Sequence, residues 1–297
     1  MEGGYPLELN YNMSGRDLIV DVQKFAKQAN GSALMRYGET VLLVTATASK
    51  EPREGIDFFP LTVDYEERMY SVGKIPGGFI KREGRPTEKA ILAARLTDRP
   101  LRPLFPKGFR NAVHVVATVM SMDQDNPPEI AAINGASIAL SISDIPFAGP
   151  VGAVMVGYVD GRLVLNPSME ERDRSQLHLI VAGTRDAIMM VESGSQEISQ
   201  GIIIDALMLA HDEIKNIVAF QEKIVNQIGK EKMEVKLSAI PAEIEDAVKS
   251  FATERLTEAV GITEKLAREA KIDGVRADWL QQFEEAPESV APAKEAF

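Results

Sequence analysis

The sequence predicts an α+β domain followed by an all-helical segment. Two observations carry this prediction. From about residue 5 to 192, short β-branched runs alternate with turn residues and with at least two helical stretches. From about residue 195 the β pattern stops, and apolar residues recur at the three- and four-residue spacing of helices.

Five runs in the first part have the composition of strands, since they are rich in valine, leucine, isoleucine and threonine. They lie at 41–47, 112–119, 154–159, 162–165 and 177–181. Asp160 and Gly161 separate two of these runs, which predicts a two-residue hairpin because both residue types tolerate positive φ. Residues 87–98 and 129–141 have helical composition, and each follows a proline and a polar residue suited to a helix start.

The second part predicts three helices. Ser195 and Ser199 are candidate N-caps for a first helix, whose apolar face continues to Gly229. A second helix is expected after Pro241 and a third after Gly261.

Composition limits the class of protein. The chain has 297 residues, of which 45% are apolar and 26% charged, so it is globular and long enough for about two cores. It contains no cysteine, which excludes disulfides, thiol nucleophiles and cysteine-based zinc sites. The N-terminus lacks the basic start and apolar core of a secretory signal, and apolar runs end well short of the ~18 residues of a membrane span. We therefore expect a soluble, cytoplasmic protein.

A basic segment stands out in this acidic chain. The formal net charge is −11, yet residues 66–110 contain eleven Lys or Arg against five Asp or Glu, a local balance of +6. Such an island is expected where a polyanion is held, and phosphate is the leading candidate. Within it, residues 73–86 place an aromatic ring and cations on a loop shaped by glycine and proline.

Two interpretations of this loop stay open on spacing alone. In the first interpretation, the loop cations contact phosphates and Phe79 stacks on a base, as in proteins that bind single strands without reading sequence. The cations in question are Lys81, Arg82 and Arg85. The alternative is a solvated turn whose cations pair with neighbouring acids. Those acids are Glu83, Glu88 and Asp98.

Three arginines follow the loop on the predicted helix. Arg95, Arg99 and Arg102 are four and three residues apart, so they share one face. Their guanidinium groups repel one another unless anions lie nearby, and Asp98 neutralises at most one of them. For Arg102, hydrogen bonding to carbonyls at the helix end is as good an interpretation as phosphate contact, whereas Arg95 favours phosphate somewhat more.

Several catalytic patterns are absent from the sequence. There is no Walker phosphate loop and no Gly-x-Gly-x-x-Gly fingerprint after a strand. His114, His178 and His211 are far apart, and the first two lie inside apolar strands, so they do not predict a zinc site. The acidic clusters at 123–126 and 170–173 are interpreted as polar loops.

Long motifs carry a resemblance to a known family. They include YGETV at 37–41, FFPLTVDY at 58–65, GKIPGGFIKREGRP at 73–86 and DRPLRPLF at 98–105. Further along are INGAS at 133–137, DIPF at 144–147, LNP at 165–167 and VAGT at 181–184. With these motifs, nearly the whole chain resembles bacterial polynucleotide phosphorylases.

The resemblance implies a domain organisation. Residues 1–192 would form the first of two RNase PH-type βαβ domains, and residues 195–283 the all-helical domain that links them. Residues 284–297, which are acidic and proline-rich, would be a linker or tail. The family's second RNase PH-type domain and its KH and OB-fold modules come later in the polypeptide, so we expect this chain to be the N-terminal part of a longer protein.

The resemblance also implies an activity and where it resides. The family degrades RNA from the 3′ end, as in mRNA degradation, by transferring nucleotidyl groups reversibly to inorganic phosphate, with Mg²⁺ held by carboxylates of the second domain. The corresponding positions here are His178, Ile180 and Arg172, and these side chains supply no carboxylate for Mg²⁺. The family's phosphate loop falls opposite residues 126–129, where two prolines remove amide donors and Glu129 repels phosphate. This domain is therefore expected to be a non-catalytic copy, with no catalytic residue and no metal site of its own.

The loop corresponds to a Phe-Phe-Arg-Arg motif of the family, which lines the opening of a trimeric ring. Here it reads FIKR at 79–82, and the lysine is a poorer planar partner than arginine, which implies a weaker grip. The predicted RNA-binding residues are Phe79, Ile80, Lys81, Arg82, Arg85, Arg95 and Arg99.

The partners implied are single-stranded RNA, inorganic phosphate, two further copies in a homotrimer, and an RNA-degradation assembly in some members. No membrane partner is expected. Two other functions remain open: a stand-alone RNA-binding or assembly module without catalysis, and a basic surface that docks protein.

Overall fold

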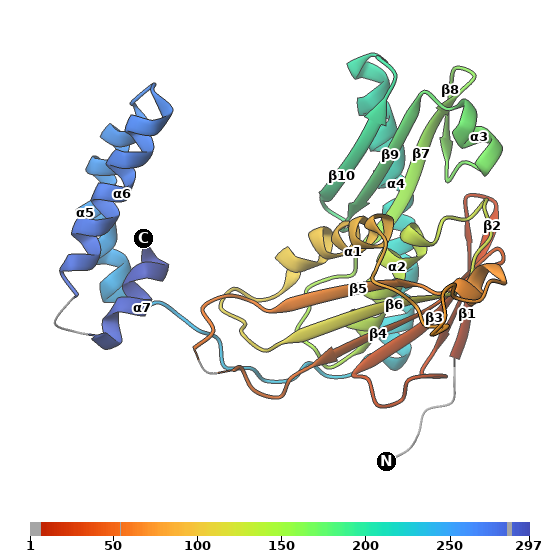
Figure 1. The fold of residues 1–297 in the computed structure, drawn as a ribbon, viewed down its shortest axis with the longest axis horizontal. Coiled ribbons are helices and arrows are strands. Elements are labelled where there is room, and N and C mark those ends of the chain that lie inside the picture. Colours follow the sequence, from red (N-terminus) through yellow and green to blue (C-terminus); the bar gives the residue numbers. More distant parts are fainter. Residues whose placement is uncertain (1–6, 54, 284–286) are drawn as a thin grey trace. The chain divides into compact units, whose positions relative to one another are not determined.

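A computed structural model describes residues 7–53, 55–283 and 287–297, which form two compact units (Figure 1). The first unit contains the described residues up to Pro52, together with Pro60–Pro106 and Asn111–Val235. The second contains the described residues of Arg53–Phe59, Lys107–Arg110 and Lys236–Phe297.

The first unit contains a six-stranded sheet with the order β1-β2-β3-β4-β6-β5. Its strands are β1 (Leu7–Met13), β2 (Arg16–Val22), β3 (Gly31–Tyr37), β4 (Thr40–Ala48), β5 (Leu61–Glu67) and β6 (Val113–Ser121). Neighbouring strands are antiparallel except β5 and β6, which are parallel and are connected through helix α1 (Glu88–Leu101). Side chains alternate between buried and more exposed positions along β4 and β6, as expected for strands of a half-covered sheet.

A second, four-stranded sheet has the order β10-β9-β7-β8 and is antiparallel throughout. Its strands are β7 (Gly152–Val159), β8 (Arg162–Leu165), β9 (Leu177–Gly183) and β10 (Ile188–Ser195). The short helix α3 (Met169–Arg174) follows β8 and begins with a capping box between Ser168 and Glu171. Asp160 and Gly161 both have positive φ, 50° and 80°, which confirms the predicted hairpin turn.

Helix α2 (Pro128–Ile142) packs against strands of both sheets and is buried on all sides. A helix that is apolar all round needs such a place, because any face turned to water would expose hydrophobic surface. The polar side chain of Asn134 is consequently satisfied inside the protein. It donates to the carbonyls of Ile130 and Ala153 at 3.1 and 3.0 Å and accepts from the Ala153 amide at 2.9 Å.

Helix α4 (Gln200–Ile228) belongs to the first unit, which differs from the expected domain boundary at 192–195. Its buried residues pack against β7, β9, β1 and α2. The division of the chain falls after Val235 instead. The physical reason is that the apolar face of α4, which correctly predicted a helix, is the cover of a sheet and not part of a separate helical core. Ser199 is its N-cap, whereas Ser195 ends β10.

The second unit is helical and consists of α5 (Ala242–Val260), α6 (Lys265–Gln281) and α7 (Pro287–Ala296), with short segments from earlier in the chain. Its core surrounds Trp279, whose indole Nε1 donates to the Ala293 carbonyl at 2.9 Å and whose ring lies 5.5 Å from that of Phe251. The helices predicted after Pro241 and Gly261 are both confirmed. The tail expected at 284–297 differs: residues 284–286 lie outside the described residues, but 287–296 form a helix whose Ala293 is buried.

Candidate nucleic-acid interface

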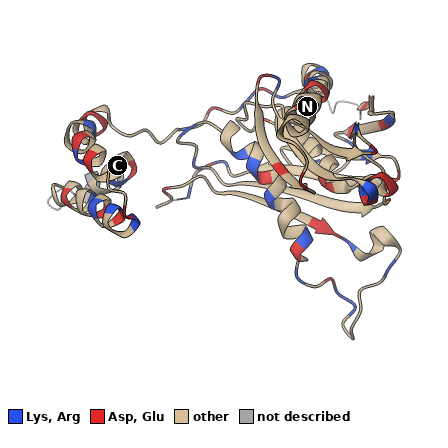
Figure 2. Cartoon of the chain, turned by 90° about the horizontal axis from the view of Figure 1, so that it is seen from above, with Lys and Arg blue, Asp and Glu red and all other residues tan. Residues whose placement is uncertain are grey.

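An irregular loop connects the 3₁₀ helix η1 (Met69–Val72) with α1 and projects from the first unit, with basic segments along it (Figure 2). Gly73 ends η1 in the left-handed conformation at φ 69°, and Gly78 has φ 75°. Lys81 also has positive φ, 54°, which is uncommon for a residue with a Cβ atom. On the other side of the loop, Thr87 accepts the Ala90 amide at 3.1 Å and starts α1.

The loop exposes apolar side chains as well as cations. Phe79 is fully exposed, and Ile75 and Ile80 are 77% and 75% exposed. Single exposed hydrophobic residues are ordinary, whereas several exposed apolar side chains close together are a feature of interaction sites.

The loop cations have no acidic partners within the described part of the chain. Lys74, Lys81, Arg82 and Arg85 form no ion pair there. The nearby acids are engaged elsewhere: Glu83 accepts a backbone amide and Asp98 pairs with Arg102 at 2.8 Å. The ion pairs that the second interpretation of the loop expected are therefore not formed by these cations, although the loop is exposed to solvent as that interpretation also expected.

Arg102 has a structural role, in agreement with one of its two interpretations. Its guanidinium group donates to both carboxylate oxygens of Asp98, at 3.0 and 2.8 Å, and to the Leu61 carbonyl at 3.0 Å. These bonds fix the end of α1 to the start of β5.

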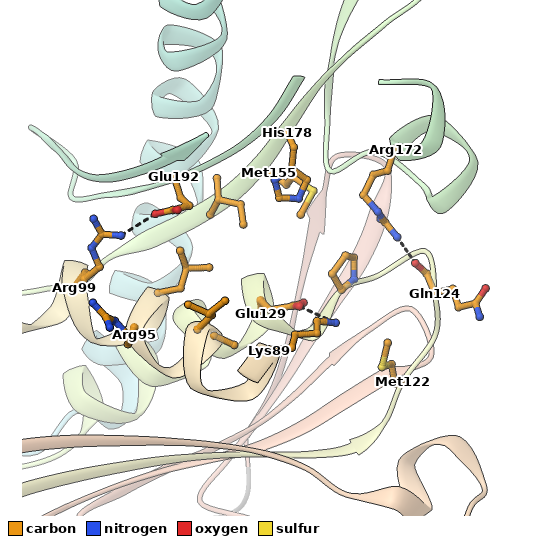
Figure 3. A pocket seen from close by; sticks show the side chains of 15 residues that line it. Lys89, Arg95, Arg99, Met122, Gln124, Glu129, Met155, Arg172, His178 and Glu192 are labelled. Atoms are coloured by element: carbon orange, nitrogen blue, oxygen red, sulfur yellow. Dashed lines mark hydrogen bonds and ion pairs between the residues drawn. The ribbon is translucent and has the colours of Figure 1, made fainter. Parts of the chain in front are cut away.

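Arg95 and Arg99 do not join the loop. They line a cavity of about 630 Å³ between α1 and the second sheet (Figure 3). The Arg99 guanidinium pairs with the Glu192 carboxylate from β10 at 2.8 Å, whereas Arg95 forms no ion pair with the described residues.

The cavity brings together the positions that the family resemblance aligned with a catalytic centre. Arg172 comes from α3, His178 and Ile180 from β9, and Pro127 and Glu129 from the start of α2. These residues are up to 53 positions apart in sequence, and only the packing of the two sheets around α2 places them in one wall. Sequence reasoning missed Glu192 and Lys89, which also line the cavity and carry no local signal.

The charges in the cavity are mostly neutralised. Lys89 pairs with Glu129 at 3.0 Å, and Arg172 donates to the carbonyls of Pro167, Asp125 and Gln124. Mg²⁺ prefers carboxylate and water oxygens as ligands. The two acids of the cavity, Glu129 and Glu192, are already paired with Lys89 and Arg99, so these residues do not fit the ion. Next to Glu129 lies the buried Tyr65; burial raises the pKa of its hydroxyl, and the Glu129 carboxylate raises it further.

Each of the other two histidines contacts a polar neighbour. His114 is exposed on β6 and its Nε2 lies 2.7 Å from the Asp64 carboxylate, while His211 lies 3.2 Å from the Thr184 carbonyl oxygen. Among the described residues, no group of three histidine or acidic side chains is arranged to hold a metal ion. Within the same residues, every helix is too short or too polar to cross a bilayer.

Three family models match the chain. Residues 14–146 match the 3′ exoribonuclease family, domain 1, and residues 149–213 match domain 2 of the same family. Residues 243–296 match the model described as polyribonucleotide nucleotidyltransferase, RNA binding domain. The first two matches correspond to the two sheets, and the second extends into α4, in agreement with the place of that helix in the first unit.

Curated relatives are highly similar. The polyribonucleotide nucleotidyltransferase of Syntrophomonas wolfei is 60% identical over 274 residues, which cover 92% of this chain and 39% of the relative. That of Heliobacterium modesticaldum is 61% identical over 269 residues, 91% of this chain and 38% of the relative. The chain thus spans about two fifths of the length of the curated relatives it matches.

A solved structure supports the fold. The crystal structure of rice Rrp46 superposes with a TM-score of 0.57 at 16% identity, covering 69% of this chain and 93% of that one. Together with the family models and the relatives, the sheets, the helical unit and the loop identify this chain as a member of the polyribonucleotide nucleotidyltransferase family.

Proposed function

We propose that this chain is the N-terminal, RNA-gripping part of a phosphate-dependent 3′-to-5′ exoribonuclease. In the complete enzyme, inorganic phosphate would attack the terminal phosphodiester of RNA and release a nucleoside diphosphate, and the reaction would run in both directions. The observation that carries the proposal for this chain is the loop at 73–86, where Phe79 is fully exposed and the neighbouring cations have no acidic partner among the described residues.

The chemistry of this loop fits single-stranded RNA. An exposed aromatic ring stacks on any base, and unpaired cations contact phosphates without reading sequence. Phe79, Lys81, Arg82 and Arg85 would hold the strand, with Ile80 as an apolar neighbour. Arg95 and Arg99 would act separately, because they line the cavity and not the loop.

Catalysis would reside outside this chain. The cavity that holds His178, Ile180 and Arg172 does not fit Mg²⁺, so the ion would be bound by the second RNase PH-type domain of a longer protein. That protein would work as a homotrimer in the cytoplasm, in some cases within an RNA-degradation assembly. These properties are proposed from the family.

A second candidate site for RNA is the helical unit, because residues 243–296 match a model whose description names RNA binding. Its charge argues against phosphate contacts, since these residues contain seven Lys or Arg and 13 Asp or Glu. Several of the cations are also held internally: Lys249 by Glu245, Arg255 by Asp278 and Lys265 by Glu269.

Binding of a fluorescent oligoadenylate to this chain distinguishes the two sites. Phe79→Ala should weaken binding by about 1–3 kcal/mol, the usual loss of one base stack. The double variant Lys81→Ala and Arg82→Ala should weaken it and reduce the slope of log affinity against log salt by roughly 0.7 for each phosphate that is no longer neutralised.

The control is the double variant Lys271→Ala and Lys294→Ala in the helical unit, which removes the same charge. Its affinity should match that of the unaltered chain. If the helical variant loses affinity and the loop variants keep it, RNA binds to the helical unit. If all variants bind RNA equally well, the loop is a protein-docking surface or has no binding role.

A further inference from the structure

Glu83 holds an unexpected position in the basic loop. Its carboxylate Oε1 accepts the backbone amide of Met69 at 2.9 Å. That amide opens η1, and the residue before it, Arg68, makes no capping bond with its side chain. A carboxylate 14 positions later therefore supplies the cap that the local sequence does not.

This hydrogen bond connects the loop to the sheet. Met122, just after β6, donates its amide to the Ser71 carbonyl in η1 at 3.3 Å, and the Ser71 hydroxyl donates to the Arg68 carbonyl at 2.6 Å. Through Met69, Glu83 ties the segment that carries Phe79 to this anchored turn.

The loop has few other restraints. Every residue from 77 to 86 is exposed, so packing does not fix the loop. In the part of the chain that the structure describes, the residues from 75 to 86 form no other hydrogen bond or ion pair with the rest of the protein.

We propose that Glu83 is a positioning residue for RNA binding. By capping η1 it orders the loop in advance, so that less conformational entropy is lost when Phe79 and the neighbouring cations engage RNA. The inference rests on the proposed RNA-binding function of the loop. According to this inference, Glu83, the one acid among the loop cations, favours RNA binding. Simple charge repulsion predicts the opposite, because an acid at this place repels phosphate.

The opposite signs of these two effects make the inference testable. Glu83→Ala removes a negative charge and the hydrogen bond, so repulsion alone predicts tighter binding of a fluorescent oligoadenylate. We expect binding to weaken by about threefold to tenfold, the cost of ordering one or two side chains or loop residues. Glu83→Gln removes the charge but keeps an oxygen that accepts the Met69 amide, so its affinity should equal or exceed that of the unaltered chain.

Glu88→Ala is the matched control for charge. Glu88 is exposed at the start of α1, so this variant loses the same charge near the loop and keeps the bond to Met69. It should bind RNA as tightly as the unaltered chain or more tightly. Equal or tighter binding by Glu83→Ala would show that Glu83 acts only through its charge and would overturn the inference.

A second measurement reports on the hydrogen bond without RNA. Amide hydrogen exchange at Met69 should accelerate in Glu83→Ala and stay slow in Glu83→Gln and Glu88→Ala. If Phe79→Ala does not affect RNA binding, the proposed function fails and the RNA-positioning role of Glu83 falls with it. If Phe79→Ala weakens binding and Glu83→Ala does not, the proposed function stands and only the inference on Glu83 is wrong.

Discussion

The side chain of Lys232 closes the C-terminal end of α2. Its Nζ atom donates to the carbonyl oxygens of Leu140, Ser141 and Ser143 at 3.1, 2.9 and 2.6 Å. These carbonyls lie where a helix leaves acceptors without intrahelical partners. Burial lowers the pKa of the Lys232 ammonium to about 8, although the nearby Asp144 carboxylate acts in the opposite direction.

The shift of this pKa predicts a pH dependence of stability. In the unfolded chain Lys232 keeps its ordinary pKa of 10.5, so between about pH 8 and 10.5 the unfolded state binds more protons than the folded state. The contribution of Lys232 to the free energy of unfolding should therefore rise with pH in this window. Urea unfolding of the chain and of Lys232→Met, followed by far-ultraviolet circular dichroism at pH 8 and pH 9.5, measures it.

The two proteins serve as each other's reference because all other titrating groups are common to both. The free energy of unfolding of the unaltered chain minus that of Lys232→Met should increase from the lower to the higher pH. A difference that stays constant or shrinks would mean that the folded environment does not disfavour the charged ammonium.

At the scale of elements, the contact between α2 and α4 decides which unit α4 belongs to. The Ser137 hydroxyl on α2 donates to Gln221 Oε1 on α4 at 2.7 Å and accepts the Val151 amide at 2.7 Å. Gln221 Nε2 in turn donates to the Val151 carbonyl at 2.7 Å. This closed set of buried hydrogen bonds joins both helices to the start of β7.

Ser137→Ala should lower the free energy of unfolding of the first unit by about 1–3 kcal/mol, because it leaves a buried amide and a buried carbonyl oxygen without their partner. Ser141→Ala is the matched control on the same helix. Its hydroxyl is buried and has no hydrogen-bond partner, so its removal should be neutral or stabilising. Urea unfolding followed by circular dichroism measures both, while the fluorescence of Trp279, the single tryptophan of the sequence, reports on the helical unit. Equal losses for both variants would contradict the role assigned to the Ser137 network.

The helices and strands differ in how well the sequence predicts them. Local signals such as β-branched runs, turn pairs and helix starts predict the bounds of the strands β4, β6, β7, β8 and β9 and of the helices α1 and α2 within a few residues. For α5 and α6 they predict the start only. The strands β1, β2, β3, β5 and β10 are not individually predicted. Along β1, for example, glutamate and asparagine alternate with Leu7, Leu9 and Tyr11, and such a half-polar strand is stabilised chiefly by its pairing with β2.

For the whole molecule, charge and catalytic potential are separated. Four cations of the projecting loop of the first unit form no ion pair with the described residues, whereas the acids of the cavity are neutralised by Lys89 and Arg99. This separation supports the proposal that the chain binds RNA and that catalysis resides outside it.

The chain by itself should therefore show no phosphorolysis. Incubated with single-stranded RNA, Mg²⁺ and phosphate, it should release no nucleoside diphosphates, because neither His178 nor Ile180 supplies a carboxylate for the ion. A full-length relative, such as the enzyme of Geobacillus kaustophilus, is the positive control. Release of nucleoside diphosphates by a preparation of this chain free of any longer enzyme would place a catalytic centre within these 297 residues.

The sequence by itself determined the α+β class, most of the helices, the family resemblance and the basic loop, since these depend on residues that are neighbours in the chain. Only the tertiary structure decided where the first unit ends, because the apolar face of α4 is compatible with a helical bundle or with a sheet until its contacts are known. It also separated Arg95 and Arg99 from Phe79, and it joined Glu83 to Met69. Such contacts between residues distant in sequence arise from packing, and no local pattern encodes them.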